Sequence, residues 1–378
     1  MLKESLRNEK AKYLELHKRY HAELIRRRKL HNTLQELKGN IRVMCRIRPL
    51  LFHETKKLNR HAGDWIQVPE ECMVTVLNEN TRKVSSYEFD HVFGPKEGQD
   101  LVFEEVQPMV VSAMDGYNVA ILAYGQTGSG KTYTMEGNIG NEGVTFKALQ
   151  EVFSMAKERI KSHQYEFSMT IIEVYNEKVH NLLDKRAEPL ELMENAKGKL
   201  KVVGLVSRKI GSSKEAIRLF EIGKKNRSIG VTNVNEYSSR SHSILTLYIK
   251  GINTELKQKI KARLDFVDLA GSERLSKSEV EGERLKEATN INLSLTTLGK
   301  VLNALAMKST HVAYRDSKLT HLLKESIGGD AKTLVLVQVS PNPNDTQETL
   351  TTLMFGTRVC NIEKGKAKKN VVKIGKKM

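Results

Sequence analysis

Cysteine is scarce in this chain of 378 residues. The three cysteines, Cys45, Cys72 and Cys360, are odd in number and widely spaced. That pattern predicts neither a disulfide framework nor a cysteine-based metal cluster. Long apolar runs are missing too, since no stretch reaches the roughly 18 residues that a membrane span needs, and the first residues lack the apolar core of a secretion signal. We therefore expect an intracellular protein without membrane insertion.

Acidic residues are in deficit and aromatic residues are few. The chain has 45 Asp and Glu against 62 Lys and Arg, a net charge of +17, which predicts an acidic partner. The charge alone does not choose between nucleic acid and an acidic protein surface. Aromatic residues make up 6% of the chain, whereas a protein that binds single-stranded nucleic acid would use aromatic rings for base stacking. The apolar content of 39% allows a large core.

Glycine is concentrated in one segment with a clear chemical meaning. Residues 125–132 read Gly-Gln-Thr-Gly-Ser-Gly-Lys-Thr, a complete G-x-x-x-x-G-K-[ST] motif, directly after the apolar run 119–124. Backbone N–H groups there would point at phosphate oxygens, and a helix starting at Gly130 would place its positive end beneath them. A chance glycine-rich turn is the alternative, but a buried-strand pattern precedes the motif. The predicted nucleotide-binding residues are Gly125, Gln126, Thr127, Gly128, Ser129, Gly130, Lys131 and Thr132.

Two further segments could sense the nucleotide. In residues 267–273, an apolar strand ends in Asp268 and a loop with Gly271 follows. Asp268 would hold Mg²⁺ through water, and the Gly271 N–H could approach a γ-phosphate. An ordinary strand and turn is the alternative. Residues 235–242 combine serine hydroxyls with Arg240, which could donate to phosphate oxygens. In isolation, a solvated serine-rich loop is the simpler interpretation of that segment.

The order of predicted elements indicates an α/β protein. We expect strands at 41–47, 119–124, 166–175, 244–250, 263–268 and 334–339, and helices at 145–161, 214–225, 289–307 and 317–327. This alternation predicts a three-layer sandwich with a central mixed, mostly parallel sheet flanked by helices. No linker-like segment divides it, so we expect one domain at 39–363, followed by a basic, mobile tail at 364–378.

A charged helix without Gly or Pro is predicted over residues 1–38. It should end at Gly39, a typical C-terminal cap. Seven of ten a and d positions in one heptad register are apolar, which predicts an imperfect coiled-coil seam and the possibility of a homo- or heterodimer. The alternative is an amphipathic helix that packs on its own domain. The seam residues are Leu6, Tyr13, Leu16, Tyr20, Leu30, Leu34 and Leu37.

Together with Arg46-Ile47-Arg48-Pro49, the three nucleotide segments resemble the motifs of the kinesin motor domain, in the same order. The resemblance extends over residues 41–361. It implies a P-loop ATPase that binds ATP and ADP with Mg²⁺. Arg46, Arg48, Pro49 and Tyr133 would bound the adenine, and Ser238 and Ser239 would lie on the γ-phosphate side. The Mg²⁺ ligands would be Thr132, Ser239 and, through water, Asp268.

The resemblance also implies catalytic and track-binding residues. Arg240 and Glu273 would form a salt bridge that closes over the nucleotide, and the implied catalytic set is Lys131, Ser239, Arg240, Gly271 and Glu273. Kinesins bind microtubules, whose acidic surface suits the net charge of +17 and does not require nucleic acid. The implied tubulin contacts are Arg284, Lys286, Lys300, Arg315, Lys318 and Lys324.

A helix before the motor resembles the C-terminal-motor, minus-end-directed class, the kinesin-fourteen family. The resemblance implies ATP-driven movement in the cytoplasm on the microtubule cytoskeleton, the spindle included, with the helix swinging as a lever about Gly39. Two alternatives remain: a microtubule-binding module that does not hydrolyse ATP, and a P-loop ATPase that acts on nucleic acid.

Overall fold

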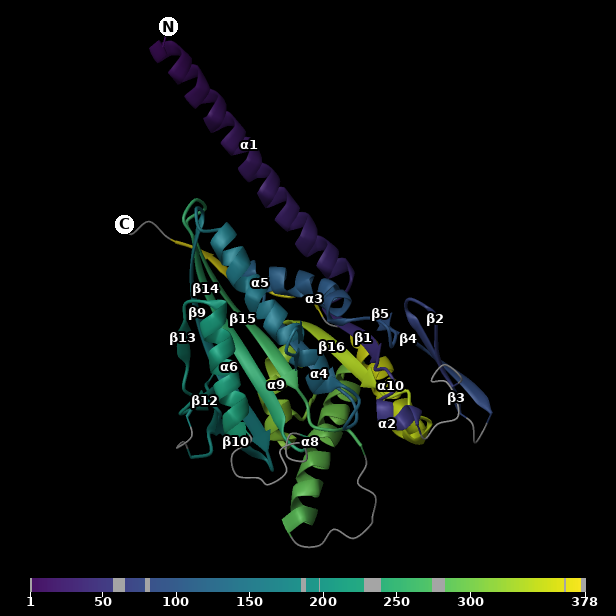
Figure 1. Cartoon of the computed structure of the whole chain (residues 1–378). Helices are drawn as coiled ribbons and strands as arrows, with labels where there is room; N and C mark the ends of the chain where they lie inside the picture. Colours follow the sequence, from purple (N-terminus) through teal and green to yellow (C-terminus); the bar gives the residue numbers. More distant parts are fainter. Residues whose placement is uncertain are drawn as a thin grey trace.

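A central sheet lies between two layers of helices, and a long helix projects from one end (Figure 1). The computed structural model of the chain describes residues 2–56, 65–78, 82–184, 188–196, 198–227, 239–273, 283–363 and 365–374. Within these residues the main path of the sheet runs in the order β10 (Lys178–Asn181), β9 (His163–Tyr175), β14 (His242–Asn253), β15 (Gln258–Asp268), β6 (Val119–Tyr124), β16 (Lys332–Val339), β1 (Ile41–Ile47) and β5 (His91–Phe93). The predicted three-layer sandwich is therefore confirmed.

The sheet is parallel in one half only. Strands β15, β6, β16, β1 and β5 pair in parallel, whereas β14, β9 and β10 form antiparallel pairs. Short β13 (Arg208–Ile210) also pairs antiparallel with β9. The expected mixed sheet is thus confirmed, with parallel pairing at four of the seven junctions of its main path. Long strands joined by a tight hairpin, such as β14 and β15, return antiparallel because no crossover helix separates them.

Helices cover both faces of the sheet and bury two apolar clusters. One face carries α3 (Gln99–Met114), α4 (Lys131–Met135), α5 (Val144–Glu158) and α6 (Ser213–Arg227), and the other carries α8 (Glu283–Ala306), α9 (Lys318–Ile327) and α10 (Thr346–Cys360). All six residues of β6 are buried, as an apolar run between two helical layers requires. No described helix combines the length and apolar character needed to cross a membrane.

Three small sheets and three short helices accompany the main sheet in the described residues. A three-stranded sheet comprises β2 (Ile66–Glu70), β3 (Met73–Asn78) and β4 (Lys83–Glu88), and two hairpins comprise β11 (Glu191–Glu194) with β12 (Leu200–Val203) and β7 (Gly137–Asn138) with β8 (Asn141–Glu142). Short helices are α2 (Phe52–Thr55), η2 (Tyr314–Asp316) and η3 (Pro343–Asp345). The strand predicted at 41–47 has those bounds and is buried on both faces, where Arg42 and Arg46 have polar partners.

The N-terminal helix α1 (Leu2–Leu37) ends before Gly39, as predicted. Its seven apolar seam residues are all exposed, from 52% for Leu34 to 81% for Leu37. The helix therefore does not pack an apolar face on its own domain, and the alternative interpretation is wrong for this seam. The predicted coiled coil itself stays a prediction.

A polar cluster holds the base of α1 against the domain. Asn32 donates to the Asp115 carboxylate at 3.0 Å, and Arg159 donates to the other oxygen of that carboxylate at 3.1 Å. The ammonium of Lys332, on β16, lies 3.4 Å from the Asn32 side-chain oxygen and 3.1 Å from the Ser112 hydroxyl. Burial lowers the pKa of Lys332 to about 8. The last turns of α1 thus dock through buried polar groups.

Part of the basic tail, which we expected to be mobile, pairs with the central sheet. Val371–Lys373 forms β17, which pairs antiparallel with β15. The Asn40 side chain donates to the Gly365 carbonyl at 2.6 Å, so the tail also contacts the joint that follows α1. The composition predicted mobility from charge alone, but the open edge of β15 beyond β6 offers backbone hydrogen bonds to the tail.

Candidate functional site

The predicted nucleotide segments meet at one edge of the sheet. Strands β1, β16, β6 and β15 are parallel, so their carboxyl ends lie together, and ligands of open α/β sheets bind at such an edge. The phosphate loop starts at Gly125, directly after β6, and α4 begins at Lys131 with Gly130 at its N-cap. The predicted strand, loop and helix are all present.

Gly125 is required by a close approach of two chain segments. Its φ is +151°, and a Cβ there would lie 2.2 Å from the Gln338 carbonyl oxygen of β16. Gly130 has a φ of +99°, in the left-handed region that favours glycine. The loop can therefore fold tightly against β16 only with these residue types.

Lys131 is buried beneath the phosphate loop. Its ammonium donates to the Gln126 carbonyl at 2.9 Å, and the Ser129 hydroxyl donates to the same carbonyl at 2.7 Å. Burial lowers the pKa of Lys131. An anionic phosphate would offer the ammonium a stronger partner than this carbonyl.

Thr132 and Asp268 together fit a hydrated Mg²⁺ ion. The Thr132 hydroxyl donates to one Asp268 oxygen at 2.8 Å, while the other oxygen is buried and has no hydrogen-bond partner among the described residues. Mg²⁺ keeps several waters and usually takes only one or two protein ligands plus phosphates. In the described part of the chain, no three His, Cys, Asp or Glu residues come together as a metal cluster. A hydroxyl beside an orphaned carboxylate oxygen is the donor set that such an ion uses.

Backbone hydrogen bonds join the three nucleotide segments. The Gly271 N–H donates to the Ser239 carbonyl at 2.8 Å, and the Ser272 N–H donates to the Gly125 carbonyl at 3.1 Å. The sequence predicts that the Gly271 N–H approaches a γ-phosphate. In this structure the Gly271 N–H faces Ser239, so its contact with a phosphate stays a prediction and requires the hydrogen bond to Ser239 to break.

Glu273 is bound to the phosphate loop. Its carboxylate accepts from the Thr127 N–H at 2.8 Å and also from the Thr127 hydroxyl. Ser239 and Arg240 are half-buried, and the salt bridge between Arg240 and Glu273 stays a prediction. Ser238 lies outside the described residues.

The four predicted adenine residues differ in accessibility. Arg46 is 6% exposed and donates to Gln99 and Thr134, both at 2.8 Å, with its guanidinium 5.4 Å from the Tyr133 ring centroid. Pro49 and Tyr133 are exposed. An adenine could therefore contact Tyr133 or Pro49 directly, while Arg46 would act by supporting Tyr133.

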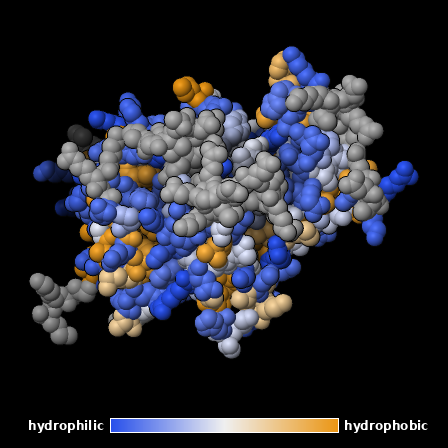
Figure 2. Space-filling model, turned by 90° about the horizontal axis from the view of Figure 1, so that it is seen from below, coloured by the Kyte–Doolittle hydropathy of each residue, from blue (hydrophilic) through white to orange (hydrophobic). Residues whose placement is uncertain are grey.

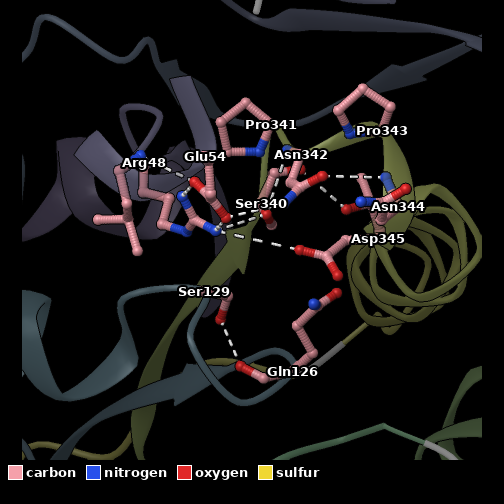
Figure 3. A network of polar contacts seen from close by, with 12 residues as sticks. Arg48, Glu54, Gln126, Ser129, Ser340, Pro341, Asn342, Pro343, Asn344 and Asp345 are labelled. Atoms are coloured by element: carbon pink, nitrogen blue, oxygen red, sulfur yellow. Dashed lines mark hydrogen bonds and ion pairs between the residues drawn. The ribbon is translucent and has the colours of Figure 1, made fainter. Parts of the chain in front are cut away.

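Arg48 lies in a polar network opposite the phosphate loop (Figure 3). It donates to both oxygens of Glu54, at 2.6 and 2.7 Å, and to the Ser340 hydroxyl at 2.8 Å. The Arg48 hydrogen bonds lower the pKa of Glu54 to about 2. Asp345 lies 4.0 Å from the same guanidinium. The network fixes Arg48 and joins β1 to the segment after β16.

His242 is a functional candidate that our sequence analysis missed. Its Nδ1 accepts from the Ala270 N–H at 2.9 Å, so the proton is on Nε2, which donates to the Ser294 hydroxyl of α8 at 2.8 Å. Burial lowers the pKa of His242 to about 3, which keeps the ring neutral. It connects the loop after Asp268 to α8. In the sequence it is the last residue of the segment 235–242, at the start of an apolar strand, and nothing there indicates a role for its ring.

The predicted track contacts lie on α8, η2 and α9, which pack together. Lys300, Arg315 and Lys318 are exposed, and Lys324 is half-buried. Arg284 and Lys286 fall on α8, but their side chains are outside the described part. Seen from below, the described surface is mostly hydrophilic, with small separate apolar patches (Figure 2). The assignment of these cations as contacts stays a prediction.

One carboxylate on β11 accepts hydrogen bonds from three basic side chains of this surface. Glu194 accepts from Arg315, from His321 at 2.9 Å and from Lys324 at 3.0 Å. These hydrogen bonds, with Arg315 first, lower the pKa of Glu194 to about 2. Two of the predicted contacts are thus held within the molecule, a detail that spacing in the sequence did not indicate.

Comparison with known proteins identifies the family. A family model described as "Kinesin motor domain" matches residues 46–362. Kinesin-like protein KIN-14R of Arabidopsis thaliana is 46% identical over 359 residues, which cover 94% of this chain and 33% of that protein. Kinesin-like protein KIN-14J of Oryza sativa subsp. japonica is 46% identical over 365 residues, covering 95% of this chain and 43% of that protein. The chain thus spans a third to somewhat under half of the length of these two relatives.

A solved structure supports the same family. The C-terminal motor and motor homology domain of Kar3Vik1, fused to a synthetic heterodimeric coiled coil, superimposes with a TM-score of 0.84 at 37% identity, covering 95% of both chains.

Proposed function

Because this chain belongs to the kinesin motor domain family, we propose that it is a motor that couples Mg-ATP hydrolysis to movement along microtubules. The observation that carries the proposal is the junction of three segments at one edge of the sheet: the phosphate loop, Ser239 and the loop of Gly271 and Glu273. A nucleotide held there would contact all three at once. The link from Ala270 through His242 to Ser294 would pass its state to α8.

Each residue has a defined task in the proposed hydrolysis. Lys131 and the loop N–H groups would bind the β- and γ-phosphates, while Thr132, Ser239 and, through water, Asp268 would hold the metal ion. Mg²⁺, when bound, neutralises charge that develops on the phosphates. Closure of Arg240 on Glu273 positions the attacking water, since phosphoryl transfer depends chiefly on positioning and charge stabilisation.

Movement toward the microtubule minus end is the proposed direction. The helix α1 precedes the motor, as in the C-terminal-motor class that the kinesin-fourteen relatives represent. The exposed apolar seam of α1 would pair with a second helix, giving a homo- or heterodimer on the cytoplasmic microtubule cytoskeleton.

The test is ATP turnover with microtubules, with DNA and with neither. We expect turnover to rise strongly with microtubules alone, and surface-attached dimers to move polarity-marked microtubules in the sense of a minus-end motor. Stimulation by DNA would instead support a nucleic-acid ATPase, and microtubule binding without turnover would support an inert module. Plus-end movement would refute the direction.

Two substitutions test the assigned residue roles. Arg240→Ala and Glu273→Ala should each abolish stimulated turnover while ATP still binds, because neither side chain holds the phosphates. Binding is measured with a fluorescent ATP analogue. Near-normal turnover in both variants would refute the proposed closure.

A further inference from the structure

A basic groove lies beside the track-facing helices, at the far end of β14 and β15. It has a volume of about 750 Å³ and lies between those strands, the docked tail and the start of β12. Six exposed lysines line it: Lys199, Lys250, Lys259, Lys261, Lys368 and Lys369. The nucleotide chemistry does not use any of them.

Few acidic side chains offset the positive charge of the lysines in this groove. Glu325 is the one carboxylate in the lining, and it pairs with Arg263 at 3.1 Å. None of the six lysines forms an ion pair with another residue in the described ranges. Glu166, opposite Lys250 on β9, pairs with Lys209 at 3.1 Å, and the charges of Lys209 and Lys250 both lower its pKa. The groove therefore presents a concentrated positive field to solvent.

Two of these lysines stand directly opposite each other on neighbouring strands. Lys250 of β14 pairs in register with Lys261 of β15. Like charges at such a position destabilise a sheet. Glu166 offsets this repulsion in part on the β9 side of Lys250, and an anionic group in the groove would offset it further.

The lining favours an extended polypeptide over other polyanions. Leu200, Val371 and Val372 give the groove apolar contacts, and β17 pairs with β15 alone among the described strands, which leaves a strand edge for backbone contacts. Tyr248, whose pKa is raised chiefly by burial, is the single aromatic residue of the lining, so stacking of bases has little support. A concave groove also suits a chain better than a flat lipid surface.

The groove shares helix α9 with the predicted track surface. Glu325 belongs to α9, whose Lys318 and Lys324 are predicted tubulin contacts. We propose that the groove binds an extended, carboxylate-rich segment of the protein track, as a second contact beside α8 and α9. The inference that the segment belongs to the track rests on the proposed function, whereas the acidic-peptide chemistry rests on the groove itself.

The experiment measures fluorescence anisotropy of a labelled peptide of about twelve glutamates, roughly 40 Å long when extended. The variant Lys250→Gln/Lys261→Gln is compared with the control Lys3→Gln/Lys10→Gln, which removes the same charge from exposed positions of α1. We expect the groove variant to bind the peptide about 5-fold more weakly and the control to bind as the unaltered chain does. Affinity should fall as salt is added. The groove variant should fold, because it removes a repulsive pair.

Further arms identify the ligand and separate the two proposals. Unchanged peptide binding in the groove variant would overturn the site. Tighter groove-dependent binding of an oligothymidylate or of phosphatidylserine vesicles would overturn the peptide assignment. In assays of microtubule-stimulated turnover, we expect the groove variant to have a higher KM for microtubules and an unchanged kcat. An unchanged KM for microtubules would overturn the track assignment. If the unaltered chain binds the peptide but microtubules do not stimulate it, the proposed function fails and the acidic-peptide site stands.

Discussion

At the residue scale, Gly271 is a position where two nucleotide segments leave no room for a side chain. A Cβ there would lie 2.3 Å from both a Glu273 carboxylate oxygen and the Thr127 hydroxyl. We predict that Gly271→Ala separates Glu273 from the phosphate loop and lowers microtubule-stimulated turnover at least about 100-fold, the scale of losing one positioned transition-state contact. Steady-state ATPase assays measure this.

The matched control for Gly271→Ala is Gly299→Ala. A Cβ at Gly299 meets nothing within 4 Å, and alanine favours the α8 helix in which it lies. Turnover should stay near the unaltered value in the control. Equal turnover in both variants would mean that the contact between Glu273 and Thr127 is not needed for hydrolysis.

Sequence patterns located the phosphate loop because its chemistry is local. Gly125 to Thr132 are adjacent in the chain, so spacing alone predicts their joint role. His242 was missed because its function depends on contacts with Ala270 and Ser294, which only the fold brings together. The burial of Arg46 could not be predicted either, since its partners Gln99 and Thr134 are distant in sequence.

At the element scale, the hairpin of β11 and β12 restrains the track-facing surface through Glu194. We predict that Glu194→Gln raises microtubule affinity about 2- to 5-fold, because Arg315 and Lys324 lose an internal carboxylate that competes with those of the track. Cosedimentation measures the affinity. Glu191→Gln removes the same charge from an exposed position of the same strand, and it should raise microtubule affinity less. Weaker binding in Glu194→Gln would show that the carboxylate instead orients these cations for the track.

The base of α1 gives a pH-dependent contribution to stability through Lys332. Its pKa is about 8 in the folded protein, below the ordinary value of 10.5. Between these values the unfolded chain holds a proton that the folded chain has released. The free energy of unfolding should therefore gain a contribution that rises with pH from about 8 to about 10.5.

Denaturant unfolding of the unaltered chain and of Lys332→Met isolates that contribution. We expect the difference in unfolding free energy to shift in favour of the unaltered chain as pH rises through this window. Lys96→Met, at an exposed position, serves as the control and should show no such trend. A difference that is constant with pH would mean that Lys332 is not held in a desolvated site.

Element types and most bounds were predictable, but docking was not. Strand β6 follows from a continuous apolar run, and helix α9 follows from apolar residues at helical spacing. The tail was expected to be mobile because its lysines dominate the local composition, yet three of its residues complete the edge of β15. Backbone pairing depends on an edge that only the folded sheet provides, so composition carries no signal for it.

At the scale of the whole molecule, α1 is the element that can convert a small change at the nucleotide into displacement. Its 36 residues give a rigid length of about 54 Å. Gly39, with a φ of +95°, lies at the joint, and contacts of Asn32 and Asn40 hold the docked position. Any swing must break these polar contacts, so docking and release are alternative states of one lever.

If α1 is a lever, velocity should scale with its length while the chemistry stays constant. We predict that deleting residues 2–19, half of the helix, lowers the gliding velocity of N-terminally tethered motors about 2-fold, because the tip displacement is proportional to length at 1.5 Å per residue. Microtubule-stimulated turnover per motor should not change, since the deleted residues lie far from the contacts of Asn32. The deletion also removes part of the exposed seam. The assay therefore uses monomeric motors attached densely to the surface, so that a change in dimer formation does not alter the velocity. A velocity independent of length would mean that movement arises within the motor domain, with α1 serving only as an attachment.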